Sequence, residues 1–270
     1  AETNDRRGIP NWLATHPEPE DRVTNVASTV DELLATTSQA GLRVERSGYL
    51  NRIDGLLYGD NPDQGIVRGN AFLHPVLRFA LEFPEGWEVQ NSEAVVVARQ
   101  PGSENHMILE LLEKPQGRGL QQIAENSMDG AGYRLRQGSM TEINGLDAFV
   151  GTYGQQVRDL GMVVARVAHI REGRSIYVFG GFAPVGEYSS VERDVYESIR
   201  SFRRLGRDEA DKIKPNRIAI YTSRDGDTWQ KIAQSGGTEI VSASTLAIMN
   251  GYAVNHQPVA GDQVKIVVPG

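Results

Sequence analysis

The residues best suited to chemistry in this sequence are its five histidines, because the chain contains no cysteine. The lack of cysteine excludes disulfides, thiol nucleophiles and zinc sites built from thiolates. A His-Glu-x-x-His zinc site needs two histidines one helical turn apart, with a glutamate between them that acts on the metal-bound water. The histidines stand at positions 16, 74, 106, 169 and 256, so no pair has that spacing. We therefore predict no metal site and no catalytic residue within this chain.

Serine and phosphate chemistry also lack a motif here. The serines have no Gly-x-Ser-x-Gly setting, and neither Gly180-Gly181 nor Gly236-Gly237 is followed by the Lys-Ser/Thr of a phosphate loop. We interpret Gly180-Gly181 as a bulge or a strand end. His74 and His169 fall on predicted strands, where we expect each to be a hydrogen-bonded structural residue.

The stretch from Thr15 to Arg22 reads Thr-His-Pro-Glu-Pro-Glu-Asp-Arg and leads into a helical pattern. Proline is tolerated in the first turn of a helix, and acidic residues there face the positive end of the helix dipole. The stretch therefore predicts a helix start with His16 held just outside it. It resembles the His-Pro-x-x-x-x-Arg stretch that follows the zinc site in the HtpX/BepA-like family of bacterial envelope zinc metallopeptidases.

This resemblance implies that the chain is the part of such a hydrolase that follows the zinc site, with zinc and proteolysis in an upstream peptidase domain. His16 would then approach a zinc ion bound upstream; the alternative is a helix-entry histidine that packs against Trp12 or a neighbouring carbonyl. We interpret Arg22 as an ion-pair residue, with a substrate clamp as the alternative. No cofactor is expected in this chain itself.

Composition describes a soluble globular protein whose 270 residues form about two or three domains. The net charge of −7 argues against a nucleic-acid binder, which normally has a basic face. No apolar run approaches the ~20 residues of a membrane span. The first residues lack the basic and apolar regions of a signal peptide. We expect a periplasmic or envelope protein whose leader has been removed, with a cytoplasmic location as the alternative.

The first predicted domain, residues 1–60, consists of two helices. Apolar residues at helical spacing predict one helix over 19–37, and a second is predicted over 47–56 with Ser47 as its N-cap. Two such helices bury little core, and the resemblance places them at the tail of a peptidase domain. The segment Asp60 to Gly65 is rich in turn residues and marks the boundary.

The second predicted domain, residues 66–205, is an antiparallel sheet covered by helices, an α+β layer. Strand patterns occur over 77–83, 94–98, 107–112, 135–143, 146–153, 162–170 and 175–182. Asn144-Gly145 and Glu172-Gly173 predict hairpin turns, and helices are predicted over 120–128 and 191–202. The cluster Leu81 to Trp87, the Gly-Leu-x-Ala-Phe strand and the closing Ser-Phe-Arg helix resemble a Mog/PsbP-like domain.

The third predicted domain, residues 214–270, begins with Ile220 to Ala233, which resembles the opening of a LysM module. A strand, a tight Asp225-Gly226 turn, a helix capped by Asp227 or Thr228, a second helix and a closing strand predict a small βααβ unit. It departs from the LysM pattern at Ser223, at Trp229 and in its extra length over 253–258. We expect Trp229 to lie in the core, on the helix face of Ile232.

The candidate glycan-binding residues of this module lie in its two loops: Asp225, Gly226, Asp227, Thr228, Asn250 and Gly251. They would hydrogen-bond acetamido sugars such as those of peptidoglycan; the alternative role of the same residues is capping and turning. Acidic and basic residues balance in the module, so no charge excess favours an anionic wall polymer. The departures from the pattern predict weak binding or none.

Together these patterns predict the non-catalytic C-terminal region of an envelope zinc metallopeptidase, which positions or regulates the protease. Its expected partners are the upstream peptidase domain, peptidoglycan and envelope proteins. The alternative is a free-standing LysM-type glycan-binding protein without a protease function.

Because the chain lacks a paired-histidine helix, we predict that it cleaves no protein on its own. The measurement is casein hydrolysis by the purified chain, with and without a chelator. Hydrolysis that the chelator abolishes would contradict the prediction.

Overall fold

The computed structural model describes residues 29–30, 32–33, 35–36, 45–235, 240–253 and 255–270. Contacts divide the chain into two compact units, residues 1–49 and 50–270, and each is described by itself. In the first unit the described residues between 29 and 36 are helical and exposed, and the Thr36 hydroxyl donates to the Glu32 carbonyl at 2.9 Å. The predicted helix start, with His16 and Arg22, lies outside the described residues.

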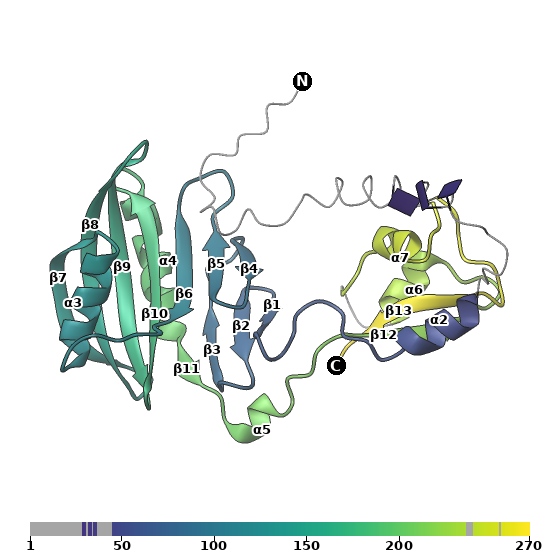
Figure 1. The fold of residues 1–270 in the computed structure, drawn as a ribbon, viewed down its shortest axis with the longest axis horizontal. Coiled ribbons are helices and arrows are strands. Elements are labelled where there is room, and N and C mark those ends of the chain that lie inside the picture. The colour runs from purple at the N-terminus through teal and green to yellow at the C-terminus, as the bar shows by residue number, and fades with distance from the viewer. Residues whose placement is uncertain (1–28, 31, 34, 37–44, 236–239, 254) are drawn as a thin grey trace. The chain divides into compact units, whose positions relative to one another are not determined.

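The fold is a mixed α+β fold with antiparallel sheets and a few helices, which confirms the predicted class (Figure 1). Its helices are α2 (Arg46–Ile53), α3 (Leu120–Gly130), α4 (Tyr188–Ser201), α5 (Arg207–Ala210), α6 (Trp229–Ser235) and α7 (Ala243–Met249). Helix α2 begins before Ser47, so this serine lies inside the helix and not at its cap. In the described part of the chain, no helix is long and apolar enough to cross a membrane.

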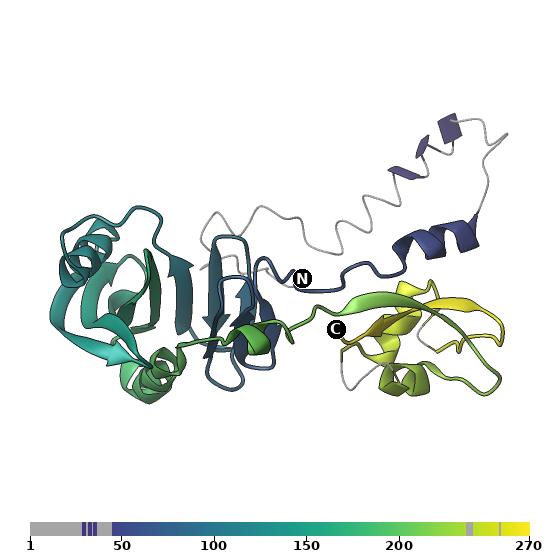
Figure 2. The ribbon, with the colours of Figure 1, turned by 90° about the horizontal axis from the view of Figure 1, so that it is seen from below.

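The larger sheet has seven strands in the order β4-β5-β6-β10-β9-β8-β7, and all its pairs are antiparallel. Its strands are β4 (Glu88–Asn91), β5 (Val95–Arg99), β6 (His106–Leu111), β7 (Arg134–Ile143), β8 (Leu146–Val157), β9 (Gly161–Glu172) and β10 (Ser175–Pro184). The sequence predicted all of them except β4. Figure 2 shows α3 and α4 on opposite faces of this sheet, which agrees with the predicted layer.

A smaller sheet has the order β1-β2-β3-β11. Its strands are β1 (Ile66–Arg68), β2 (Ala71–His74), β3 (Phe79–Glu82) and β11 (Arg203–Arg204). Only β3 was predicted, and Leu77 proves to be an exposed turn residue before it. The other strands have only two to four residues, which is too short to establish an alternating pattern.

The main hydrophobic core lies between the larger sheet, helix α4 and the smaller sheet. Phe79 of β3 stacks on Phe202, which follows α4, with ring centroids 5.2 Å apart. The same Phe79 ring lies 4.7 Å from the ring of Tyr177 on β10. Val191, Val195 and Ile199 form the buried face of α4, as their helical spacing predicted. Aromatic pairs therefore join both sheets to the end of the helix.

The two long hairpins form as the turn residues indicate. Asn144 and Gly145 both have positive φ, 48° and 78°, as a two-residue hairpin turn of this kind requires. The second hairpin is shifted by one residue from the prediction. Glu172 pairs with Ser175, so the turn is Gly173-Arg174, with Gly173 at φ 59°.

Gly180-Gly181 is neither a bulge nor a strand end, contrary to the sequence interpretation. Both residues lie in the middle of β10 and pair in continuous register with β6 and β9. A β-carbon on Gly181 would lie 2.3 Å from Cγ2 of Val195, so this glycine allows α4 to approach the sheet closely. Gly181 thus serves helix packing, and a β-carbon on Gly180 would instead meet the neighbouring strand β9; neither glycine breaks the strand.

The C-terminal part contains a strand, two helices and a strand in that order: β12 (Arg217–Thr222), α6, α7 and β13 (Gln263–Val268). The two strands pair antiparallel along their full length. Trp229 and Ile232 of α6 are buried in a shared cluster, as predicted for Trp229. The element order agrees with the predicted βααβ unit; its assignment as a LysM module stays a prediction.

The free edge of β12 is covered by the chain that follows α2. The Gly55 N–H donates to the Ile218 carbonyl at 2.8 Å, and the Ile218 N–H donates to the Leu56 carbonyl at 2.8 Å. The Tyr58 N–H donates to the Asn216 carbonyl at 2.9 Å. Covering an edge in this way satisfies backbone groups that would otherwise be open to pairing with another chain.

His169 of β9 is fully buried, with a relative exposure of 0%. Neither of its ring nitrogens has a hydrogen-bond partner among the described residues, contrary to the expected hydrogen-bonded histidine. Its cross-strand neighbours are Phe149 and Val178, both apolar. Burial lowers the pKa of His169 to about 4. His74, by comparison, accepts a hydrogen bond from the Leu77 N–H at 3.2 Å.

We predict that His169 makes the protein less stable in mild acid. Its pKa is lower in the folded chain than in the unfolded chain, so below about pH 6.5 the unfolded state binds a proton that the folded state excludes. The resulting loss of folding stability increases as the pH falls, until the pH reaches the pKa of about 4 in the folded chain. At about pH 5 it amounts to about 2 kcal/mol.

The test is urea unfolding of wild type and His169→Leu at about pH 7.5 and about pH 5. The substitution should remove this part of the pH dependence, whatever its effect at neutral pH. If the free energy of unfolding changed with pH by the same amount in both proteins, protonation of His169 would not destabilise the fold, and the prediction would be wrong.

Candidate functional site

The predicted loop residues of the C-terminal module mostly build the module itself. Gly226 has a φ of 75° in the turn after β12, where the Asp227 N–H donates to the Arg224 carbonyl at 3.2 Å. The Asp227 carboxylate accepts from the Arg224 N–H and from the Tyr221 hydroxyl, each at 2.7 Å. These two hydrogen bonds, the backbone one first, lower the pKa of Asp227. Asp227 is therefore the residue that closes the turn.

Thr228, and not Asp227, caps helix α6. Its hydroxyl oxygen accepts from the Lys231 N–H at 3.2 Å, which satisfies one of the free N–H groups of the first turn. Asp225 lies within the turn that precedes the helix and is exposed. The two alternatives left open by the sequence are thus separated: Thr228 caps the helix and Asp227 holds the turn before it.

Asn250 joins the end of α7 to strand β13. Its side-chain nitrogen donates to the carbonyls of Leu246 and Lys265, both at 2.9 Å, and its side-chain oxygen accepts from the Lys265 N–H at 2.7 Å. The residue is buried, and the following Gly251 has a φ of 76°. These bonds give Asn250 a structural role, because both polar atoms of its side-chain amide bond to groups inside the module.

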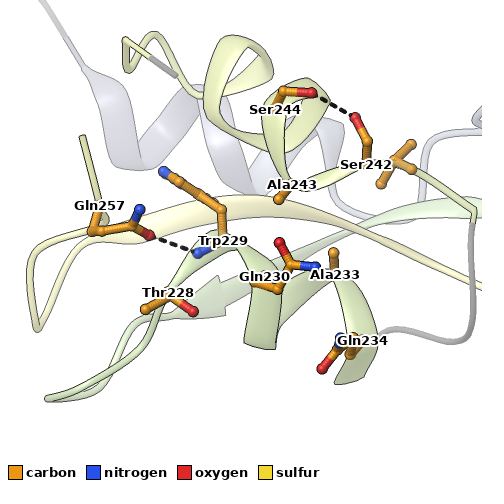
Figure 3. A pocket seen from close by; sticks show the side chains of 10 residues that line it. Thr228, Trp229, Gln230, Ala233, Gln234, Ser242, Ala243, Ser244 and Gln257 are labelled. Carbon is orange, nitrogen blue, oxygen red and sulfur yellow. Dashed lines mark hydrogen bonds between the residues drawn. The ribbon is translucent and has the colours of Figure 1, made fainter. Parts of the chain in front are cut away.

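The module contains a cleft of about 790 Å³ between α6 and the start of α7 (Figure 3). It is lined by Thr228, Trp229, Gln230, Ala233, Gln234, Val241, Ser242, Ala243, Ser244 and Gln257. Thr228 is the one predicted site residue among them. None of these lining residues carries a charge. Their polar groups are amides and hydroxyls, and the remaining surface is apolar.

One wall of the cleft is fixed by Trp229. Its backbone N–H donates to the side-chain oxygen of Gln257 at 3.0 Å, which Figure 3 shows as a dashed line. Its indole nitrogen donates to the His256 carbonyl at 2.8 Å. The opposite side begins at Ser242, which caps α7 by accepting from the Thr245 N–H at 3.1 Å. The side chains of Gln230 and Gln234 make no protein hydrogen bond within the described part of the chain.

Sequence reasoning missed five of the polar lining residues: Gln230, Gln234, Ser242, Ser244 and Gln257. The spacing of Gln230 and Gln234 by four residues was an available signal, because it places both on one helix face. The serines and Gln257 gave no signal, since they come from other segments that only the fold brings together.

The described residues contain no group of three or more His, Asp or Glu side chains that could hold a metal ion. His74, His106 and His169 lie on three different strands, β2, β6 and β9. The prediction about zinc bound upstream concerns His16, which is outside the described residues, and so stays a prediction.

No family model and no curated protein matches the sequence. Solved structures with weak similarity include a Pseudomonas aeruginosa protein of unknown function, with 13% identity and a TM-score of 0.36, over 45% of this chain and 88% of that one. Cyanobacterial PsbP from Synechocystis sp. PCC 6803 has 14% identity and a TM-score of 0.37, over 63% of this chain and 99% of that one.

The third neighbour is LpqN of Mycobacterium tuberculosis, involved in cell envelope biogenesis. It has 13% identity and a TM-score of 0.36, over 62% of this chain and 100% of that one. The structural neighbours thus include a PsbP protein and an envelope-associated protein. Their names mention neither a peptidase nor a LysM module.

We predict that Asn250→Ala destabilises the C-terminal module by about 2 kcal/mol, because three buried hydrogen bonds are lost. Asn255→Ala is the matched control, since Asn255 is exposed and its truncation should change stability by less than about 0.5 kcal/mol. The measurement is urea unfolding of the full chain. An Asn250→Ala protein with wild-type stability would return Asn250 to the candidate ligand contacts.

Proposed function

We propose that this chain is a non-catalytic binding protein of the cell envelope whose C-terminal module binds a neutral glycan of acetamido sugars. The observation that carries the proposal is the uncharged cleft between α6 and α7. Ligand sites commonly combine apolar walls with a few polar groups that fix the orientation of the ligand. Amide and hydroxyl groups can both donate to and accept from sugar hydroxyls and acetamido groups.

The lack of charge in the cleft supports a neutral ligand. A site for an anionic polymer would be expected to present lysine or arginine, and none is found among the described residues that line this cleft. Ala233, Val241 and Ala243 supply small apolar surface against which an acetyl methyl group or a sugar face could pack. Gln230 and Gln234 offer amides that the described protein does not use.

A positioning role follows from glycan binding. A module that holds a wall glycan would keep the protein attached to it near the cell wall. That this attached protein is a zinc metallopeptidase rests on the Thr15–Arg22 stretch alone. The coding sequence upstream of Ala1 tests this part: a His-Glu-x-x-His helix there supports the peptidase, and its absence favours the free-standing glycan binder.

The glycan proposal is tested by titrating the full chain with oligomers of N-acetylglucosamine and following binding by calorimetry. Weak, saturable binding is expected. Replacing Gln230 and Gln234 together with Ala should weaken it at least about fivefold, since each change removes a hydrogen-bonding group from the cleft.

Gln156→Ala is the matched control, because Gln156 is an exposed glutamine of the larger sheet. It should leave the affinity unchanged. An equal affinity of the double variant and the wild type would exclude the cleft as the binding site. No saturable binding by the wild type would overturn the proposal.

A further inference from the structure

A second, smaller pocket lies on the larger sheet, at the C-terminal end of α3. Its volume is about 230 Å³. The lining residues come from β6, α3 with its C-terminal turn, and β10: His106, Ile108, Glu110, Ser127, Met128, Ala131, Tyr133, Val178, Gly180 and Phe182. The pocket belongs to the middle part of the chain, so it shares no residue with the cleft of the C-terminal module.

The floor of this pocket is apolar and is opened by a glycine. Val178, Gly180 and Phe182 alternate along β10 and so lie on one face of the sheet. A β-carbon on Gly180 would lie 2.5 Å from the Arg166 carbonyl oxygen and 2.7 Å from Cα of Val167. Cγ2 of Val167 would lie at 2.7 Å as well, so this position admits no side chain, and the flanking Val178 and Phe182 border the pocket.

Aromatic rings close one end of the pocket. The His106 ring stacks on the Phe182 ring, with centroids 5.2 Å apart and an interplanar angle of 7°. The Tyr133 ring meets Phe182 edge-on at 5.5 Å. His106 Nδ1 lies 2.9 Å from the Glu104 carbonyl, which can only accept, so Nδ1 carries the proton. Burial lowers the pKa of His106, and its neutral Nε2 is therefore an acceptor.

A carboxylate without a partner marks the other end. Glu110 lies four residues beyond His106 on the same face of β6, about 13 Å along the strand at ~3.3 Å per residue. Its cross-strand neighbours are the apolar residues Val95 and Val178. Glu110 is exposed to solvent along part of its side chain. Within the described residues it makes no hydrogen bond or ion pair, and its partial burial raises its pKa.

The charges around the pocket favour a positive group at the Glu110 end. Arg99 stands opposite His106 in the strand register and so lies at the far end from Glu110. Aromatic rings also attract organic cations through their faces.

We propose that this pocket binds a small aromatic amine. The ring of the ligand would occupy the apolar space over Gly180, its ammonium group would pair with the Glu110 carboxylate, and a hydrogen-bond donor at its other end would reach Nε2 of His106. The ligand chemistry follows from the three parts of the site: an unpaired carboxylate, an apolar centre and a neutral acceptor.

The experiment compares tyramine with tyrosol, its neutral counterpart in which a hydroxyl replaces the amine. Binding to the full chain is followed by calorimetry and by the backbone amide signals of Gly180 and Phe182. Wild type should bind tyramine at least about fivefold more tightly than tyrosol, the effect of one partly exposed ion pair. Glu110→Gln should remove this preference while keeping the shape of the side chain.

Glu113→Gln is the matched control, since Glu113 is exposed just beyond β6 and outside the pocket. It should keep the preference for tyramine. A second variant, Ser127→Tyr, should block the pocket from its rim and weaken the binding of both compounds. Equal affinity for tyramine and tyrosol, a preference that persists in Glu110→Gln, or no saturable shift at Gly180 and Phe182 would each overturn the proposal.

Discussion

The cleft of the C-terminal module depends on the hydrogen bond from the Trp229 indole nitrogen to the His256 carbonyl. Trp229 is 1% exposed and packs edge-on against Tyr252 at 5.2 Å, so the donor has a fixed position. Its backbone N–H also holds the side chain of Gln257. One buried residue thereby fixes both the first turn of α6 and the segment opposite it. Without these bonds, the segment that carries Gln257 would not be held at a defined distance from α6.

The departures of this module from the LysM pattern are connected by these same contacts. The extra length lies around residues 253–258, and Trp229 binds that segment at His256 and Gln257. Ser223 is also buried, and its hydroxyl donates to the carbonyls of Val259 and Asp262. Apolar aliphatic side chains at these two positions could make neither the indole bond to His256 nor the hydroxyl bonds of Ser223. Trp229 and Ser223 therefore both hold the segment that leads from α7 to β13.

Local patterns in the sequence predicted the long elements, while distant contacts decided the rest. Asn144-Gly145 needs only its own two positive φ values to define a hairpin, so the prediction succeeded. The prediction for Gly180-Gly181 failed because Gly181 is needed for the approach of Val195, fourteen positions away, and Gly180 for the approach of Val167 on β9, which the pattern along one strand cannot show. The candidate site divides in the same way. Thr228 was predicted from its helix start, but Ser242 and Gln257 reach the cleft only through the fold.

Polar side chains that hydrogen-bond to other protein groups hold the fold together, whereas those that do not are available to bind a ligand. Asp227 and Asn250 look like ligand contacts in the sequence, yet protein groups already bond to Oδ2 of Asp227 and to both polar atoms of the Asn250 amide, and a ligand at these atoms would compete with those bonds. Gln234 and Glu110 are not used in this way by the described residues, and both border open pockets. Leaving a polar group unpaired next to an apolar pocket brings no stability, which makes such groups the better candidates for recognition. This criterion selects an uncharged cleft and a carboxylate-bearing pocket, and it therefore supports two ligands of different chemistry.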